Sequence, residues 1–114
     1  MRREIRDRPL EIDEIHNLLN DPYRRDLIQI LQNDENLVVT FDELLTTLAE
    51  MRTNHSAESI ETDEIALRLV HIHIPHLIDA GVLDYDTKTE EIRYYRNEIV
   101  EFINEKTREI EQLL

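Results

Sequence analysis

The chain has 114 residues, 40% of them hydrophobic, which is enough for one domain with a single core and too little for two. It has no cysteine, which excludes disulfides and thiolate metal sites, and it shows neither an apolar run long enough to cross a membrane nor an N-terminal export signal. We therefore expect a cytoplasmic protein that does not enter a membrane.

Charge is strongly unbalanced, with 26 acidic against 13 basic side chains and a formal net charge of −13. Only two of the basic residues, Lys88 and Lys106, are lysines. An acidic, lysine-poor surface is typical of proteins from salt-accumulating halophiles, because at molar salt the Debye length falls to about 3 Å and carboxylates repel one another little. We expect the protein to lose stability when salt is removed.

Residues 1–9 form a short arm rich in arginine, and Arg3 and Arg6 in it are candidates for DNA contacts. Basic arms of this kind enter the minor groove in some DNA-binding proteins. The alternative is a flexible, solvated terminus.

The first structured elements are two helices. Apolar residues recur every three or four positions over residues 10–20, which predicts an amphipathic helix. A second helix is expected to start at Pro22, with Asn20 or Asp21 as its cap.

A short strand and a third helix follow. The β-branched run 37–39 predicts the strand. Thr40, with Glu43 three residues later, forms a capping box that starts a helix over 41–51, and the polar segment 52–61 is expected to be a loop.

The fourth helix, over 62–80, ends at the only glycine, Gly81, which can take the left-handed conformation of a helix exit. Strands 82–85 and 92–95 are expected to form a hairpin, and a last helix spans 97–114. The order predicts an α+β fold that is mostly helical.

The strings DPYRRDLIQIL, VTFDELLTTLAE and LVHIHIPHLIDAGVLDYD resemble the winged helix-turn-helix modules of haloarchaea, which are similar to the arsenical-resistance-repressor class of regulators. The most distinctive part is HIHIPHL running into AGV. The resemblance covers residues 10–96 and implies a DNA-binding regulator with helix 62–80 as recognition helix and 82–95 as wing. Residues 97–114 are then an added C-terminal helix.

On a wheel at about 100° per residue, helix 62–80 separates into two faces. The predicted core stripe is Ala66, Val70, Ile74 and Leu77, with Leu67 and His73 at its margins. The predicted exposed set is Glu64, Arg68, His71, Pro75 and Asp79. Arg68 is the candidate for a bidentate guanine contact and His71 for a second base contact; the alternative is that both are ordinary solvated side chains.

Two further features concern the same helix. Ile65, Leu69 and Ile72 form a second apolar strip between the faces, for packing against another helix or another subunit. Pro75 removes one backbone hydrogen bond inside the helix, which predicts a kink within 70–74.

Electrostatics are the main objection to DNA binding. Duplex affinity comes from neutralising phosphates, yet the wing tip 84–91 is more acidic than basic. The remaining candidates for DNA contacts are Arg24 and Arg25 in the second helix and Arg93 beside the wing.

The sequence has no glycine-rich phosphate loop and no recognisable nucleophile with its base, so we expect no enzyme activity and no cofactor. His73 and His76 are three residues apart and could share a metal, but nothing in the sequence fixes a third ligand beside them. No metal site is assigned, and neither a small-molecule nor a metal effector is expected.

The last helix predicts self-association. Ile99, Ile103, Lys106, Ile110 and Leu113 alternate steps of four and three, and Phe102 and Leu114 widen this seam. The pattern favours a homodimer through Ile99, Phe102, Ile103, Ile110 and Leu113; the alternative is a helix that folds back over its own domain.

The sequence thus favours a homodimeric transcriptional regulator of a halophilic archaeon that binds double-stranded DNA. The alternative is a winged-helix module that binds protein and not DNA. Arg24, Arg25, Arg68 and Arg93 converging beside an exposed fourth helix would favour DNA, whereas scattered arginines would favour the protein partner.

Overall fold

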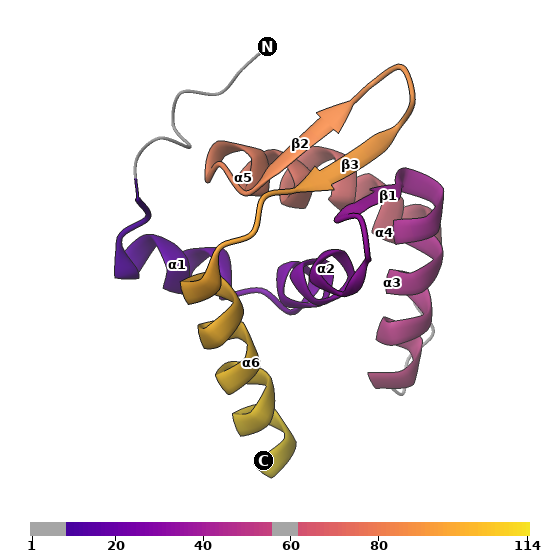
Figure 1. The fold of residues 1–114 in the computed structure, drawn as a ribbon. Helices are drawn as coiled ribbons and strands as arrows, with labels where there is room; N and C mark the ends of the chain where they lie inside the picture. Colours follow the sequence, from indigo (N-terminus) through magenta and orange to yellow (C-terminus); the bar gives the residue numbers. More distant parts are fainter. Residues whose placement is uncertain (1–8, 56–61) are drawn as a thin grey trace.

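The computed structural model describes residues 9–55 and 62–114. In chain order its elements are α1 (Ile12–Leu18), α2 (Pro22–Asn33), β1 (Val38–Thr40), α3 (Phe41–His55), α4 (Thr62–Arg68), the π-helical turn η2 (Leu69–His73), α5 (Ile74–Asp79), β2 (Leu83–Asp86), β3 (Glu91–Tyr94) and α6 (Glu98–Leu113). The fold is α+β and mostly helical, as predicted (Figure 1). Within the described ranges, no helix is both long and apolar enough to cross a membrane.

Side-chain caps start α2 and α3 where the sequence predicted. The Asp21 carboxylate accepts a hydrogen bond of 2.8 Å from the Tyr23 N–H, and Pro22 takes the first helical position. At α3 the Glu43 N–H donates to the Thr40 hydroxyl at 3.1 Å, and the Thr40 N–H donates to the Glu43 carboxylate at 2.9 Å. Both capping predictions are confirmed.

The exit from α5 is a Schellman motif built on Gly81. This glycine has a φ of 81°, in the left-handed region that a side chain disfavours. Its N–H donates to the Ile78 carbonyl at 2.9 Å, and the Val82 N–H donates to the Leu77 carbonyl at 3.2 Å. The chain therefore leaves the helix at Gly81, as predicted, and enters β2 at Leu83, one residue later than predicted.

The three strands form one antiparallel sheet in the order β1-β3-β2. The β2–β3 hairpin turns tightly, because the Asp86 carboxylate accepts hydrogen bonds from the backbone N–H groups of Lys88 (2.8 Å) and Thr89 (3.3 Å). Glu90 then adopts a positive φ of 59°. At least one acidic residue of the hairpin tip, Asp86, therefore serves to stabilise the turn.

One core joins the sheet to the helices. In Figure 1, α2 lies at the centre of the fold, between α3 and α6, and it packs against both. The core residues that are completely buried include Leu27, Ile28, Leu31, Leu44, Leu48, Ile65, Leu69, Leu77, Leu83, Ile92 and Val100. The same core also contains Ile15 and Leu18 of α1 and Val39 of β1.

The third helix is longer than predicted. It continues to His55, so the segment expected to be a loop from residue 52 begins inside α3. Two contacts hold the extra turn: Arg52 donates to the Asp26 carboxylate at 2.8 Å, and the Thr53 hydroxyl donates to the Ala49 carbonyl at 2.8 Å. The rest of that loop, and the arm with Arg3 and Arg6, lie outside the described residues.

Candidate nucleic-acid interface

The predicted recognition helix is a continuous helical segment, 62–79, with a π turn in its middle. The Ile74 N–H donates to the carbonyl of Leu69, five residues back, where an α-helix would use the residue four back. Pro75 follows directly and has no N–H to continue a regular ladder. A kink was predicted within 70–74, and the departure from α-helical geometry that the structure has there is this π turn.

The π turn changes which residues face the core. Ile65, Leu69, His73 and Leu77 are spaced by four and are all buried. In a regular α-helix each step of four overshoots a full turn by about 40°, so such a row would spiral away from the core. The wider π turn offsets part of this drift. Val70 was predicted to point inward, and this is wrong, because 51% of it is exposed.

The predicted burial of other residues in this helix is confirmed at some positions and wrong at others. Ile74 and Leu77 are buried as predicted. Ile65 and Leu69, which were assigned to an intermediate strip, belong to the core face instead. We call the opposite side the outer face; its exposed residues are Glu64, Leu67, Arg68, Val70, His71, Ile72, Pro75 and Asp79.

Arg68 and His71, the two candidate base-contacting residues, both lie on the outer face. The Arg68 guanidinium is 3.1 Å from the Glu64 carboxylate and 5.9 Å from the centre of the Tyr23 ring. The two side chains of this ion pair are about half exposed, and such a pair is worth only about 0.3–0.5 kcal/mol. A stronger acceptor can therefore displace Glu64 from Arg68.

Arg24 is not a surface residue, which corrects its assignment as a DNA contact. Only 7% of it is exposed, and its guanidinium donates to the carbonyls of Leu18 (2.7 Å) and Asn17 (3.2 Å). A third nitrogen lies 3.2 Å from His73 Nδ1. Arg24 thus joins α1, α2 and η2 from inside, where no phosphate can reach it.

The contact with Arg24 also fixes the state of His73. Arginine only donates hydrogen bonds, so His73 Nδ1 must accept and the ring must be neutral, with its proton on Nε2. Nε2 lies 3.9 Å from the Asp21 carboxylate, and the ring stacks on Tyr23 with centroids 5.4 Å apart. Burial lowers the pKa of His73, against the opposing charge of Asp21.

His76 does not combine with His73 into a metal centre in the part of the chain described. Across residues 9–55 and 62–114, no three histidine, aspartate or glutamate side chains are grouped for metal binding. Burial lowers the pKa of His76 too, which leaves it neutral near pH 7.

The remaining candidate arginines point to different parts of the molecule. Arg25 donates to the Leu19 carbonyl at 2.8 Å and to the Glu111 carboxylate at 2.6 Å, so it ties α2 to α6. Arg93 is exposed on β3, between two residues whose side chains face the core. Arg24, Arg25, Arg68 and Arg93 therefore do not converge on one surface.

The α6 helix has one face on its own domain and a second face that is apolar and exposed. Val100 and Asn104 are buried, and the Asn104 amide donates to the Arg25 carbonyl at 3.1 Å. The exposed side carries Ile99, Phe102, Ile110 and Leu113, which we call the α6 apolar face, with Ile103 half-buried at its edge. The α6 helix therefore packs on its own domain with one face and leaves the other face exposed and available to a second copy of the chain.

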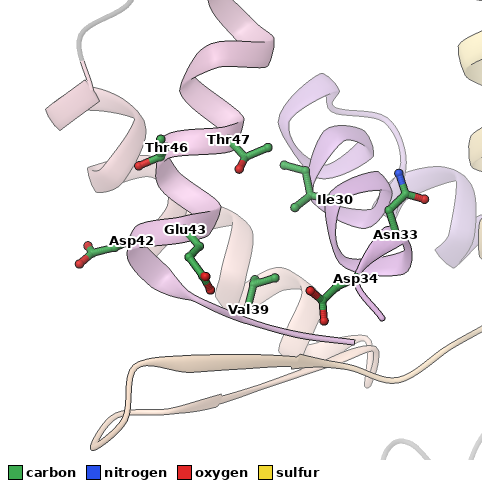
Figure 2. A pocket seen from close by; sticks show the side chains of 8 residues that line it. All are labelled: Ile30, Asn33, Asp34, Val39, Asp42, Glu43, Thr46 and Thr47. Atoms are coloured by element: carbon green, nitrogen blue, oxygen red, sulfur yellow. The ribbon is translucent and has the colours of Figure 1, made fainter. Parts of the chain in front are cut away.

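A hollow between the end of α2 and the start of α3 is lined by several acidic side chains (Figure 2). Two of its three carboxylates have backbone partners: Asp34 accepts from the N–H groups of Asn36 and Val38, and Glu43 accepts from that of Thr40. These acids shape a turn and a helix start, and we assign no ligand to the hollow.

Comparison with known families gives a match over most of the chain. A family model described as a domain of unknown function, DUF7344, matches residues 16–93, which is more than half of the chain. The match runs from within α1 to β3 and does not include α6. No curated protein matches the chain, and no solved structure does.

Proposed function

The chain belongs to the DUF7344 family, and for this member we propose a DNA-binding transcriptional regulator that acts as a homodimer through a winged helix-turn-helix domain. The chain order α2-β1-α3, then the helical segment 62–79, then β2-β3, supports this fold. The sheet order β1-β3-β2 also supports it, because the hairpin is then anchored beside β1 and its turn projects freely.

The observation that carries the proposal is the exposed outer face of helix 62–79, which follows α3 and precedes the hairpin. Its inner residues Ile65, Leu69 and Leu77 are fully buried, so the outer face is held rigidly toward solvent. A major groove about 12 Å wide admits a single helix presented in this way.

Arg68 is the residue through which this face would read sequence. A bidentate contact to guanine discriminates by about 1–3 kcal/mol, more than the exposed Glu64 pair is worth, so a guanine edge would displace Glu64. Val70 and Ile72 are also exposed on this helix, and apolar side chains contact the methyl group of thymine. The face therefore suits a site that contains both bases.

The small number of available cations agrees with binding at high salt. Lys88 and Arg93 on the hairpin are exposed, and Arg3 and Arg6 belong to the N-terminal arm. The logarithm of the DNA association constant falls with that of the salt concentration, with a slope of about −0.9 per phosphate neutralised. A protein that neutralises few phosphates loses little affinity as salt rises.

The α6 apolar face supports the homodimer. Ile99, Phe102 and Ile110 are each exposed by 58–59%, and Leu113 by 85%. A two-fold interface would cover these side chains in both copies. Dimeric helix-turn-helix regulators place two recognition helices about 34 Å apart on successive turns of DNA, which is the geometry such a dimer would need.

Selection from a pool of random DNA duplexes in molar potassium chloride tests the function. The wild-type chain is expected to enrich one motif, and Arg68→Gln to lose preference at one base position of it. Arg96→Gln is the matched control, because Arg96 is similarly exposed and paired with a glutamate, but lies outside helix 62–79 and the α6 apolar face. Failure of the wild-type chain to enrich any motif would reject DNA reading.

A second candidate function is protein binding by the same outer face. Leu67, Val70 and Ile72 are 51–60% exposed there, and the four candidate arginines do not converge, which is the arrangement expected for a protein-binding module. If no duplex is enriched while the α6 apolar face still forms a dimer, this alternative becomes the better account of the outer face.

A further inference from the structure

A hollow of about 320 Å³ between α2, α3 and α6 gathers three arginines. We call it the arginine pocket; its charged residues are Arg25, Asp26, Arg52, Arg108 and Glu111. Three guanidinium groups against two carboxylates leave one excess positive charge, in a chain whose net charge is −13. The charge of the pocket is therefore opposite in sign to the net charge of the chain.

Asp26 is buried beneath the pocket and holds two of its arginines in place. Its side chain is 5% exposed and accepts from Arg52 through one oxygen and from Arg108 through the other, each at 2.8 Å. These contacts hold the guanidinium of α3 and that of α6 on either side of α2. The two arginines are thus positioned before any ligand arrives, which lowers the entropy cost of binding one.

Arg52 and Arg108 have donors to spare. A guanidinium carries five N–H groups, and Asp26 engages one nitrogen of each residue. Within residues 9–55 and 62–114, Arg52 makes one further polar contact, with the Tyr23 ring, whose centre lies 5.4 Å from the guanidinium carbon. Arg108 makes no other hydrogen bond or ion pair in these residues. Their side chains are 17% and 24% exposed, so the remaining donors border a partly desolvated space.

Glu111 is the adjustable member of the pocket. Its side chain is 48% exposed, against 12% for its partner Arg25. If Glu111 swings into solvent, the pocket gains a second excess positive charge. Two positive charges and several free donors match a phosphate group, which carries about −1.5 to −2 charges at pH 7 and three acceptor oxygens.

We propose that the arginine pocket binds phosphate, either as the free ion or as the phosphate group of a small metabolite. Bound phosphate bridges α6 to α2 and α3, and so fixes the helix that carries the α6 apolar face. No small-molecule effector was expected from the sequence. The proposal does not depend on DNA binding, because the pocket and the outer face have no residue in common.

Calorimetric titration and thermal unfolding of the full chain test the proposal. Potassium phosphate is compared with potassium chloride at equal ionic strength, and adenosine monophosphate and succinate are added as separate probes. We expect one saturable phosphate site and a higher melting temperature in phosphate. Tighter binding of adenosine monophosphate than of phosphate assigns the site to a metabolite; the reverse assigns it to the free ion.

Variants separate the pocket from a general salt effect. Arg108→Gln is expected to weaken phosphate binding about tenfold or more, as the loss of a charge-assisted hydrogen bond does. Arg96→Gln removes the same kind of charge from an exposed site outside both the pocket and the α6 apolar face, and it is expected to bind phosphate as the wild type does. Equal melting temperatures in the two salts, or equal phosphate affinity in Arg108→Gln, would overturn the proposal.

Arg108→Gln also removes a partner of buried Asp26, so a second variant covers the case in which that chain fails to fold. Glu111→Gln changes an exposed side chain and removes a competing carboxylate. It is expected to bind phosphate more tightly than the wild type. Unchanged or weaker binding in Glu111→Gln, or tighter binding of succinate than of phosphate, would reject the phosphate assignment.

Discussion

Adjacent positions of the fourth helix give a sharp test of its register. Leu69 is fully buried and Val70 is 51% exposed. A regular helical wheel predicts the opposite, with Val70 more buried than Leu69. We compare Leu69→Ala with Val70→Ala. The two variants differ by one position, so they share the same local backbone and the same distance from the hairpin.

The expected magnitudes follow from burial. Truncating a fully buried leucine to alanine costs about 3–5 kcal/mol, the lost transfer free energy plus a cavity term. A domain of this size has a total stability of roughly 6–17 kcal/mol, so Leu69→Ala removes a large share of it. At about 4 °C per kcal/mol, the melting temperature should fall by at least ~10 °C.

Val70→Ala should have little effect. An exposed substitution changes the free energy of unfolding by about 0.5 kcal/mol or less, and alanine has the higher helix propensity. Both variants are measured by urea unfolding in molar salt. A larger loss in Val70→Ala than in Leu69→Ala would refute the register that the π turn sets.

Three further predictions concern pH, assembly and salt. Because burial lowers the pKa of His73, the unfolded chain binds more protons than the folded chain between the two pKa values. The free energy of unfolding therefore has its full contribution from His73 above the unfolded pKa of about 6.5. Below that pH the contribution falls, by at most ~1.4 kcal/mol per pH unit. His73→Gln keeps an acceptor for Arg24 and should reduce that slope in pH-dependent unfolding; an unchanged slope would exclude His73 as its source. Phe102→Ser combined with Leu113→Ser should convert a dimer to a monomer in sedimentation at high salt, with the circular dichroism spectrum retained, and a variant that still dimerises would exclude the α6 apolar face. Finally, the melting temperature should fall between molar and millimolar potassium chloride, and a constant value would remove the halophilic interpretation of the acidic surface.

Truncation of the chain after Arg96 is no substitute for the surface variants. Val100 is part of the core, and Arg108 is a partner of buried Asp26. Removing a partner from a buried ion pair is strongly destabilising. A truncated chain would therefore test folding, and point changes on the α6 apolar face test association.

Features set by local chemistry could be predicted from the sequence. Asp21 with Pro22 starts α2, Thr40 with Glu43 starts α3, and Gly81 ends α5, because each device acts within one turn of the chain. Element order and the hairpin followed from these signals and from apolar periodicity.

Features set by long-range packing could not be predicted in the same way. A wheel assumes a uniform rotation per residue, so it misplaces Val70 once η2 widens the turn, even though Pro75 marks the irregularity. Arginine is rarely buried, and nothing near Arg24 in the sequence identifies His73, 49 positions away, as its partner. The arginine pocket depends on Arg52 and Arg108, which lie 26 and 82 positions from Asp26.

The outer face of helix 62–79 is the surface that we propose contacts duplex DNA. The most direct measurement is NMR of isotope-labelled protein titrated with an enriched duplex, or with a random-sequence duplex, in high salt. We predict that the amide signals of Glu64, Arg68 and His71 shift together with those of the β2–β3 hairpin. An absence of shifts at saturating DNA, or shifts confined to α6, would contradict the claim.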